Sequence, residues 1–149
     1  MSVEVGWATA TTGAALATRM ATGILGAHPG PLHHHGPSCG SLEHGRPSFD
    51  AGPAVSIAYA GWLVVVACGA VTALGVDVEA AGADPAWVQE EAAAKARGTG
   101  LTEGPVDREG LILVPLTVPG HVTWLAVQAA SPPSIRTGAW EEPDARATR

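Results

Sequence analysis

Four charged side chains in the middle of the chain are spaced so that they could act on one ligand. Asp77 and Glu79 lie two residues apart in a stretch typical of a strand, so both side chains point to one face. Glu91 and Lys95 lie four residues apart in a stretch typical of a helix, one turn from each other on one face. Three carboxylates suit a hard cation such as Mg²⁺, and the lysine suits the phosphates that such an ion carries. Such a set could hold a metal–pyrophosphate and assist phosphoryl transfer, but taken alone it is more often an ordinary surface feature.

The strand that must carry the first two acids follows a long apolar segment. Residues 54–76 contain no charged side chain, a length that would suit a membrane-spanning helix. Three glycines interrupt this segment, and it is rich in Val, Ile and Thr, which favour strands. We therefore predict no membrane span but three consecutive strands, at residues 54–58, 62–68 and 71–79.

The helix that must carry the other two charged groups has clear start and stop signals. Asp84 is a typical N-cap, and Pro85 follows at the first helical position. Gly98 and Gly100 are suited to end the helix, and Lys95 lies favourably in its last turns. The sequence thus predicts one helix directly after the strand with the paired acids.

Patterns elsewhere predict the remaining elements. Residues 13–26 have apolar side chains at helical spacing and a plausible stop at Gly26. Residues 27–41 contain too many Pro and Gly for regular structure, so the three histidines at 33–35 are expected in an exposed loop rather than in a metal site. Residues 111–118 and 121–129 read as a hairpin, and the Pro-rich, charged residues from 131 onward are expected to fray.

Composition limits the classes of protein to consider. The 149 residues, at 15.0 kDa, suffice for one domain but not for two independent cores. Acidic residues outnumber basic ones by 14 to 8, a formal charge of −6, which argues against a generic nucleic-acid-binding surface. The residues at the N-terminus have no positive region, and the two cysteines define no disulfide framework. We therefore expect no secretory signal, a buried Cys68 thiol and a cytoplasmic location.

Three segments share their order and their letters with a known family. They read HGRPSFDAGPAVSIAYAGWLVVVA, ALGVDVEA and WVQEEAAAKARGTGL. This series resembles the motifs of the Sfp-type 4′-phosphopantetheinyl transferases, closely over about residues 45–101 and loosely on either side. The resemblance implies an α+β, 4′-phosphopantetheinyl transferase-like fold, with antiparallel strands packed on a long helix. Two shortened pseudo-symmetric halves would cover residues 1–69 and 70–130, within a domain of residues 1–130 followed by a tail of residues 131–149.

The resemblance also implies roles for single residues. Asp77, Glu79 and Glu91 match the family's Mg²⁺ ligands, and Glu91 would also take the proton from a serine hydroxyl. Lys95 matches the lysine that stabilises charge on the phosphate. The positions implied to contact coenzyme A are Arg19, Arg46, Pro47, Ser56 and Tyr59. The implied reaction transfers 4′-phosphopantetheine from coenzyme A to a serine of an acyl or peptidyl carrier protein and releases adenosine 3′,5′-bisphosphate.

Three departures from the family pattern keep other functions open. The family's S-H-S triplet reads A-Y-A around Tyr59, and Glu90 stands where the family has a lysine. Only seven residues separate Glu79 from Trp87, where the family has several tens. One alternative is a protein without transfer activity that binds a carrier protein. Another is a repurposed biosynthetic enzyme of cyclase or isomerase type, with Tyr59 and Glu91 as an acid–base pair.

The position of three tryptophans bears on whether the protein associates with itself. Trp62, Trp87 and Trp124 occur in apolar stretches, and we expect them in the core. A shortened cleft could instead leave them at the surface, where they would favour a homo-oligomer.

Overall fold

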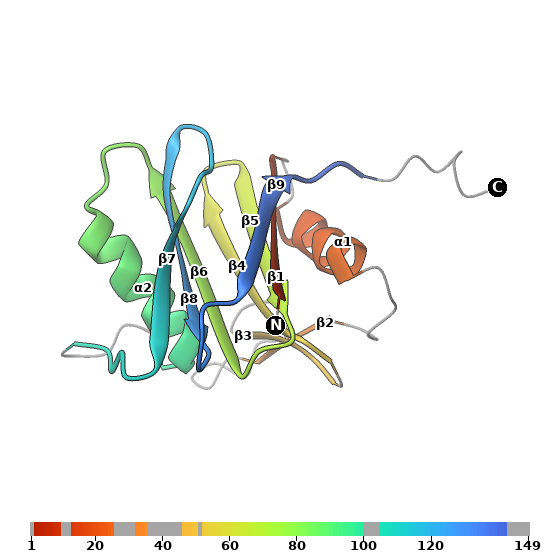
Figure 1. Ribbon diagram of the computed structural model, residues 1–149. Helices are drawn as coiled ribbons and strands as arrows, with labels where there is room; N and C mark the ends of the chain where they lie inside the picture. The colour runs from red at the N-terminus through yellow and green to blue at the C-terminus, as the bar shows by residue number, and fades with distance from the viewer. Residues whose placement is uncertain are drawn as a thin grey trace.

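The part of the chain that the structure describes consists of two helices, two main sheets and a separate pair of short strands (Figure 1). The computed structural model describes residues 2–9, 13–25, 32–35, 46–50, 52–99 and 105–142. The elements in these ranges are β1 (Ser2–Thr9), α1 (Gly13–Leu25), β2 (Leu32–His35), β3 (Arg46–Phe49), β4 (Ala54–Ala60), β5 (Leu63–Gly69), β6 (Ala73–Ala80), α2 (Pro85–Arg97), β7 (Leu111–Leu116), β8 (His121–Gln128) and β9 (Ser134–Ala139). The fold is therefore mixed α+β and consists mostly of sheet.

The two main sheets repeat one connectivity. The first sheet has the strand order β4-β5-β1-β9, and the second has the order β6-β8-β7. In each sheet, a first strand is followed by a helix and then by a hairpin of two strands, and the second strand of the hairpin lies between the other two strands. In the first sheet these elements are β1, α1, β4 and β5, and in the second they are β6, α2, β7 and β8. All of these pairings are antiparallel, whereas β9 joins β1 in parallel. Strands β2 and β3 form a separate pair.

The sheets share one core and carry the helices on their outer faces. The first and second sheets meet along β4 and β6. Alternate residues of each strand point inward, and the shared core consists of Val3, Val5, Ala58, Leu63, Val65, Ala67, Leu74, Val76, Val78, Val118, Leu125 and Val127. Helix α1 packs Leu16, Met20 and neighbouring residues on the outer face of the first sheet. Helix α2 packs Ala92 and Ala96 on the outer face of the second, and Figure 1 shows the helices on either side of the sheets.

Most locally encoded elements lie where the sequence predicts them. The three strands predicted in the apolar region are β4, β5 and β6, and the predicted hairpin is β7 and β8. Gly26, Cys39 and Gly100 lie outside the described residues, while Cys68 is buried as expected. Burial, and secondly the charge of Glu4, raises the pKa of the Cys68 thiol to about 12. Within the described segments, no helix is long and apolar enough to cross a membrane.

Three predictions are wrong. Residues 32–35 are not irregular: they form β2 and pair with β3, and His33 Nε2 lies 3.2 Å from Asp50 Oδ1. Residues 134–139 do not fray but form β9, because the open edge of β1 supplies hydrogen-bond partners that local composition does not reveal. Trp62 and Trp87 are not core residues, with 68% and 49% of their surfaces exposed, whereas Trp124 packs partly buried beside α2. Self-association through the exposed indoles remains a prediction.

Candidate functional site

A glycine allows α2 to lie directly on β6. A Cβ atom at Gly75 would lie 2.1 Å from the carbonyl oxygen of Ala92 and 2.5 Å from the amide nitrogen of Ala96. No side chain fits in that space, so the helix backbone rests on the strand backbone. Asp77 and Glu79 follow Gly75 on the same face of β6 and therefore point to the side that α2 covers. The contact brings the two acids of the strand next to the charged residues of the helix.

The ends of α2 hold it in this position. Asp84 Oδ1 accepts a hydrogen bond from the Ala86 amide at 3.0 Å, which confirms the predicted N-cap. Gly98 ends the helix in the left-handed conformation, with φ 70°, and its amide bonds to carbonyl oxygens of the last turn. Between these ends, Val88, Ala92 and Ala96 are buried, so the helix cannot rotate without exposing apolar surface.

The three acids converge. Asp77, Glu79 and Glu91 each place a carboxylate oxygen so that the three oxygens lie within 4.8 Å of one another. The Lys95 ammonium group lies beside them, 3.0 Å from Asp77 Oδ1 and 3.3 Å from the carbonyl oxygen of Ile57 on β4. The lysine therefore spans the line where the two sheets meet. The acid cluster, as we call Asp77, Glu79 and Glu91, could hold a metal ion.

One oxygen of the cluster is buried and lacks a donor. The Asp77 side chain is only 6% exposed, and its Oδ2 atom accepts no hydrogen bond from the described residues while Glu91 is ionised. A buried carboxylate oxygen without a partner is unfavourable. Protonation of Glu91 would relieve this, because its carboxyl group would then donate to Asp77. A cation between the carboxylates would relieve it as well.

Glu91 titrates close to neutral pH. Burial is the largest cause that raises its pKa to about 7, followed by the hydrogen bond to Asp77 and the charges of Asp77 and Glu79. The nearby Lys95 charge acts in the opposite direction. At neutral pH, without a metal ion, the cluster therefore exists in two protonation states.

This raised pKa predicts how stability depends on pH. Glu91 binds its proton more tightly in the folded chain, with a pKa of about 7, than at its ordinary value of 4.5. Its contribution to stability is therefore fully present below that ordinary value and is lost as the pH rises through about 7. Chelator-treated protein should lose stability to urea between about pH 5 and about pH 8. Glu91→Gln should reduce this loss and make the protein more stable than the wild type at the upper end. An equal slope for both proteins would contradict the prediction.

The residues expected to contact coenzyme A lie on three elements, α1, β3 and β4. Ser56 is buried, and its Oγ accepts a hydrogen bond from the Val76 amide at 3.0 Å, so it satisfies an edge amide of β6. Tyr59 lies on β4, 47% exposed, and burial of part of its ring raises its pKa. Arg19 lies on α1 with its Nε 2.7 Å from Glu142 Oε1. Pro47 pairs with His34 on the β2–β3 pair, next to Arg46, whose side chain lies outside the described part.

Glu90 does not face the cluster. Its Oε2 lies 2.5 Å from Arg108 Nη2, and its Oε1 accepts a hydrogen bond from the Val106 amide at 2.6 Å. The hydrogen bond from Arg108 is the main reason why the pKa of Glu90 is lowered. Its charge is thus compensated by an arginine on the segment before β7. Arg108 removes much of the repulsion that a glutamate at this position would exert on an anionic ligand.

The described basic side chains all have partners. The pairs are Arg19 with Glu142, Lys95 with Asp77, Arg97 with Gln128, Arg108 with Glu90, and Arg136 with Glu4. A polyanionic ligand would have to compete with these partners or bring its own cation.

Sequence reasoning identified the cluster but missed what positions it. The missed residues are Gly75, on which α2 rests, and Ile57, whose carbonyl oxygen binds Lys95. A glycine inside a predicted strand signals a close backbone approach and could have identified the first. The chain matches no protein-family model and no curated protein sequence.

Proposed function

We propose that this protein is a Mg²⁺-dependent 4′-phosphopantetheinyl transferase that modifies a serine of an acyl or peptidyl carrier protein. The observation that carries the proposal is the acid cluster, which lies beside Lys95. In this cluster, the buried Asp77 Oδ2 atom accepts no hydrogen bond from the described residues. These are the residues that the motif resemblance assigns to the metal and to the phosphate. The repeated strand–helix–hairpin connectivity also agrees with the two pseudo-symmetric halves that the resemblance implies. Because coenzyme A is the donor, we place the reaction in the cytoplasm.

The donor set fits a small hard cation. Three carboxylates offer oxygen ligands, and Mg²⁺ prefers six, so water and phosphate oxygens would complete its coordination. A bound Mg²⁺ would polarise the pyrophosphate of coenzyme A and neutralise part of its charge. Asp77 and Glu79 would hold the ion from β6, and Glu91 would hold it from α2.

Two residues would act on the reacting groups. Lys95 already lies within hydrogen-bond distance of a carboxylate and could turn its ammonium group to a phosphate oxygen. Glu91, which the resemblance implies as the base, would accept the proton from a serine hydroxyl. The serine oxygen would then bond to the β-phosphorus of coenzyme A as the bond to adenosine 3′,5′-bisphosphate breaks.

A transfer assay tests this function. The protein is incubated with coenzyme A, Mg²⁺ and several apo carrier proteins, and the intact mass of each carrier is measured. We expect one carrier to gain the mass of phosphopantetheine. The gain should disappear with Glu91→Gln or chelator and persist with Glu90→Gln, which alters the adjacent residue on the Arg108 side. No gain on any carrier, with no calorimetric heat for coenzyme A, would contradict the proposal.

A second candidate is a carrier-protein-binding module without transfer activity. The observation in its favour is that every described lysine and arginine side chain already has a partner, while Tyr59 stands where the family has a histidine. Such a protein would bind a carrier in a pull-down without changing its mass. Carrier binding without coenzyme A binding would favour this candidate over the transferase.

A further inference from the structure

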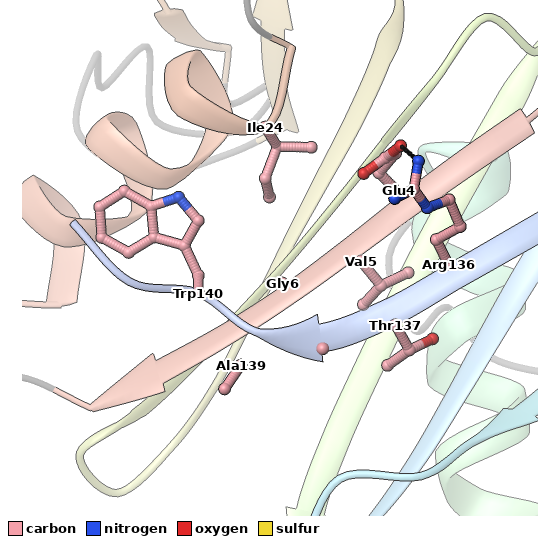
Figure 2. A pocket seen from close by; sticks show the side chains of 9 residues that line it. Glu4, Val5, Gly6, Ile24, Arg136, Thr137, Ala139 and Trp140 are labelled. Carbon is pink, nitrogen blue, oxygen red and sulfur yellow. Dashed lines mark hydrogen bonds and ion pairs between the residues drawn. The ribbon is translucent and has the colours of Figure 1, made fainter. Parts of the chain in front are cut away.

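A groove lies along β1 and β9, beside the C-terminal half of α1 (Figure 2). Its volume is about 230 Å³, below the roughly 300–1,000 Å³ of sites for drug-sized ligands. Three kinds of residue line it: the glycines Gly6 and Gly138, the apolar residues Ile24 and Trp140, and the oppositely charged residues Glu4 and Arg136. The groove is thus the size of a small metabolite and has chemically distinct parts.

The floor of the groove is bare backbone. Gly6 and Gly138 are direct partners in the parallel pairing of β1 and β9. A Cβ atom at Gly138 would meet no atom within 4 Å, so the space above it is open. At Gly6 a Cβ atom would lie 3.0 Å from Ile24 Cδ1 and 3.3 Å from Trp140 Cβ, which shows how closely the apolar wall approaches. A flat group could therefore lie on the open backbone at Gly138, beside the apolar wall that Ile24 and Trp140 form over Gly6.

One end of the groove carries opposite charges. Arg136 Nη1 lies 3.4 Å from Glu4 Oε1, and the two side chains are 78% and 44% exposed. A long, exposed ion pair contributes little to stability, so both side chains can turn toward a ligand at small cost. The arginine can bind a carboxylate with two parallel hydrogen bonds, and the glutamate can accept from an ammonium group.

The other end is apolar. Ile24 of α1 and the Trp140 ring form it, and Figure 2 shows them on the same side of the strands as the ion pair. The Trp140 amide donates to the Trp7 carbonyl oxygen at 2.9 Å, which fixes the backbone that carries the ring. The glycines lie two residues along each strand from the ion pair, a spacing of about 7 Å. This spacing is comparable to the length of an aromatic amino-acid side chain.

We propose that this groove is a binding site for a free α-amino acid with an aromatic side chain. Arg136 would bind the carboxylate, Glu4 the ammonium group, and the ring would lie on Gly138 against Ile24 and Trp140. Binding is non-covalent and neutralises both charged residues without adding net charge. The site is built from α1, β1 and β9 and shares no residue with the acid cluster, so it does not depend on the proposed transferase activity.

The proposal is tested by titrating the protein with L-phenylalanine. Binding is measured by calorimetry and by the NMR shifts of the Gly6 and Gly138 amides. We expect saturable binding with a Kd of about 1 mM or tighter. Phenylpropionate, without the ammonium group, and phenethylamine, without the carboxylate, should each bind about tenfold more weakly or worse, a loss of about 1.4 kcal/mol. Arg136→Gln should weaken binding similarly.

A matched pair of variants on β9 separates binding from folding. Gly138→Val fills the open floor with a side chain that suits a strand and should abolish binding while leaving the melting temperature unchanged. Ser134→Val adds the same side chain to the same strand outside the groove and should bind as the wild type does. Absence of saturable binding to the wild type would overturn the proposal, as would unchanged binding to Gly138→Val. Equal affinity for phenylalanine and phenylpropionate would overturn the proposal as well, because it would show that the groove binds a carboxylate without recognising the ammonium group. Glu91→Gln should retain binding.

Discussion

Replacing Gly75 by alanine should destabilise the protein more than the same replacement at any other described glycine. The new Cβ would lie 2.1 Å from Ala92 O and 2.5 Å from Ala96 N, both backbone atoms of α2. Rotation of a side chain cannot relieve this contact, so the whole helix must move away from β6. We expect a loss at or above the upper end of the about 1–3 kcal/mol seen for overpacked cores. Thermal unfolding should show a melting temperature lower by about 10 °C.

The same displacement should affect the acid cluster. Glu91 and Lys95 move with α2, whereas Asp77 and Glu79 stay on β6, so the three carboxylates would separate. Folded Gly75→Ala protein should therefore bind Mg²⁺ more weakly in calorimetry at a temperature well below its transition. Gly138→Ala is the matched control, since a Cβ there meets nothing within 4 Å. A melting temperature for Gly75→Ala that equals that of this control would contradict the prediction.

Replacing Asp77 by asparagine should nearly abolish divalent-metal binding. The substitution keeps the shape of the side chain but removes one carboxylate from the cluster and the ionic partner of Lys95. Loss of an outer-shell partner already costs about 10–100-fold in metal affinity, so loss of a direct ligand should cost more than about 100-fold. Calorimetric titration with Mg²⁺, and with Mn²⁺ as a second oxygen-seeking ion, measures the effect.

Glu90→Gln is the matched control for this experiment. It removes one negative charge from the same helix, next to Glu91, but that charge faces Arg108 rather than the cluster. Metal affinity should therefore stay within about threefold of the wild type, a difference below about 1 kcal/mol. Equal metal affinity for Asp77→Asn and Glu90→Gln would exclude the acid cluster as the metal site.

The elements around the acid cluster could be predicted because their signals are local. Asp84, Pro85 and Gly98 mark the ends of α2 within the helix itself, and the apolar alternation of β6 places Asp77 and Glu79 on one face. The spacing of Glu91 and Lys95 then suffices to bring four charged groups to one side of a strand–helix pair.

Features that depend on distant parts of the chain could not be predicted. Glu90 looked unfavourable next to an anion because its partner, Arg108, lies on a separate segment. Ser56 matched a ligand-binding position, yet its Oγ accepts a hydrogen bond from the Val76 amide at the edge of β6. This hydrogen bond forms only because β4 and β6 meet in the fold. Trp62 occurs in an apolar stretch, but the β4–β5 turn directs it to the surface. Local composition contains no information about any of these pairings.

The parallel pairing of β9 with β1 has a consequence for synthesis of the protein. Residues 2–7 are made well before their strand partners, residues 134–139. Until residues 134–139 are made, the edge of β1 that β9 covers therefore stays open while the rest of its sheet can already form. Contacts between residues so distant in sequence form slowly, and open strand edges invite pairing with other chains. The newly made chain should thus be especially prone to aggregation until β9 leaves the ribosome and pairs with β1.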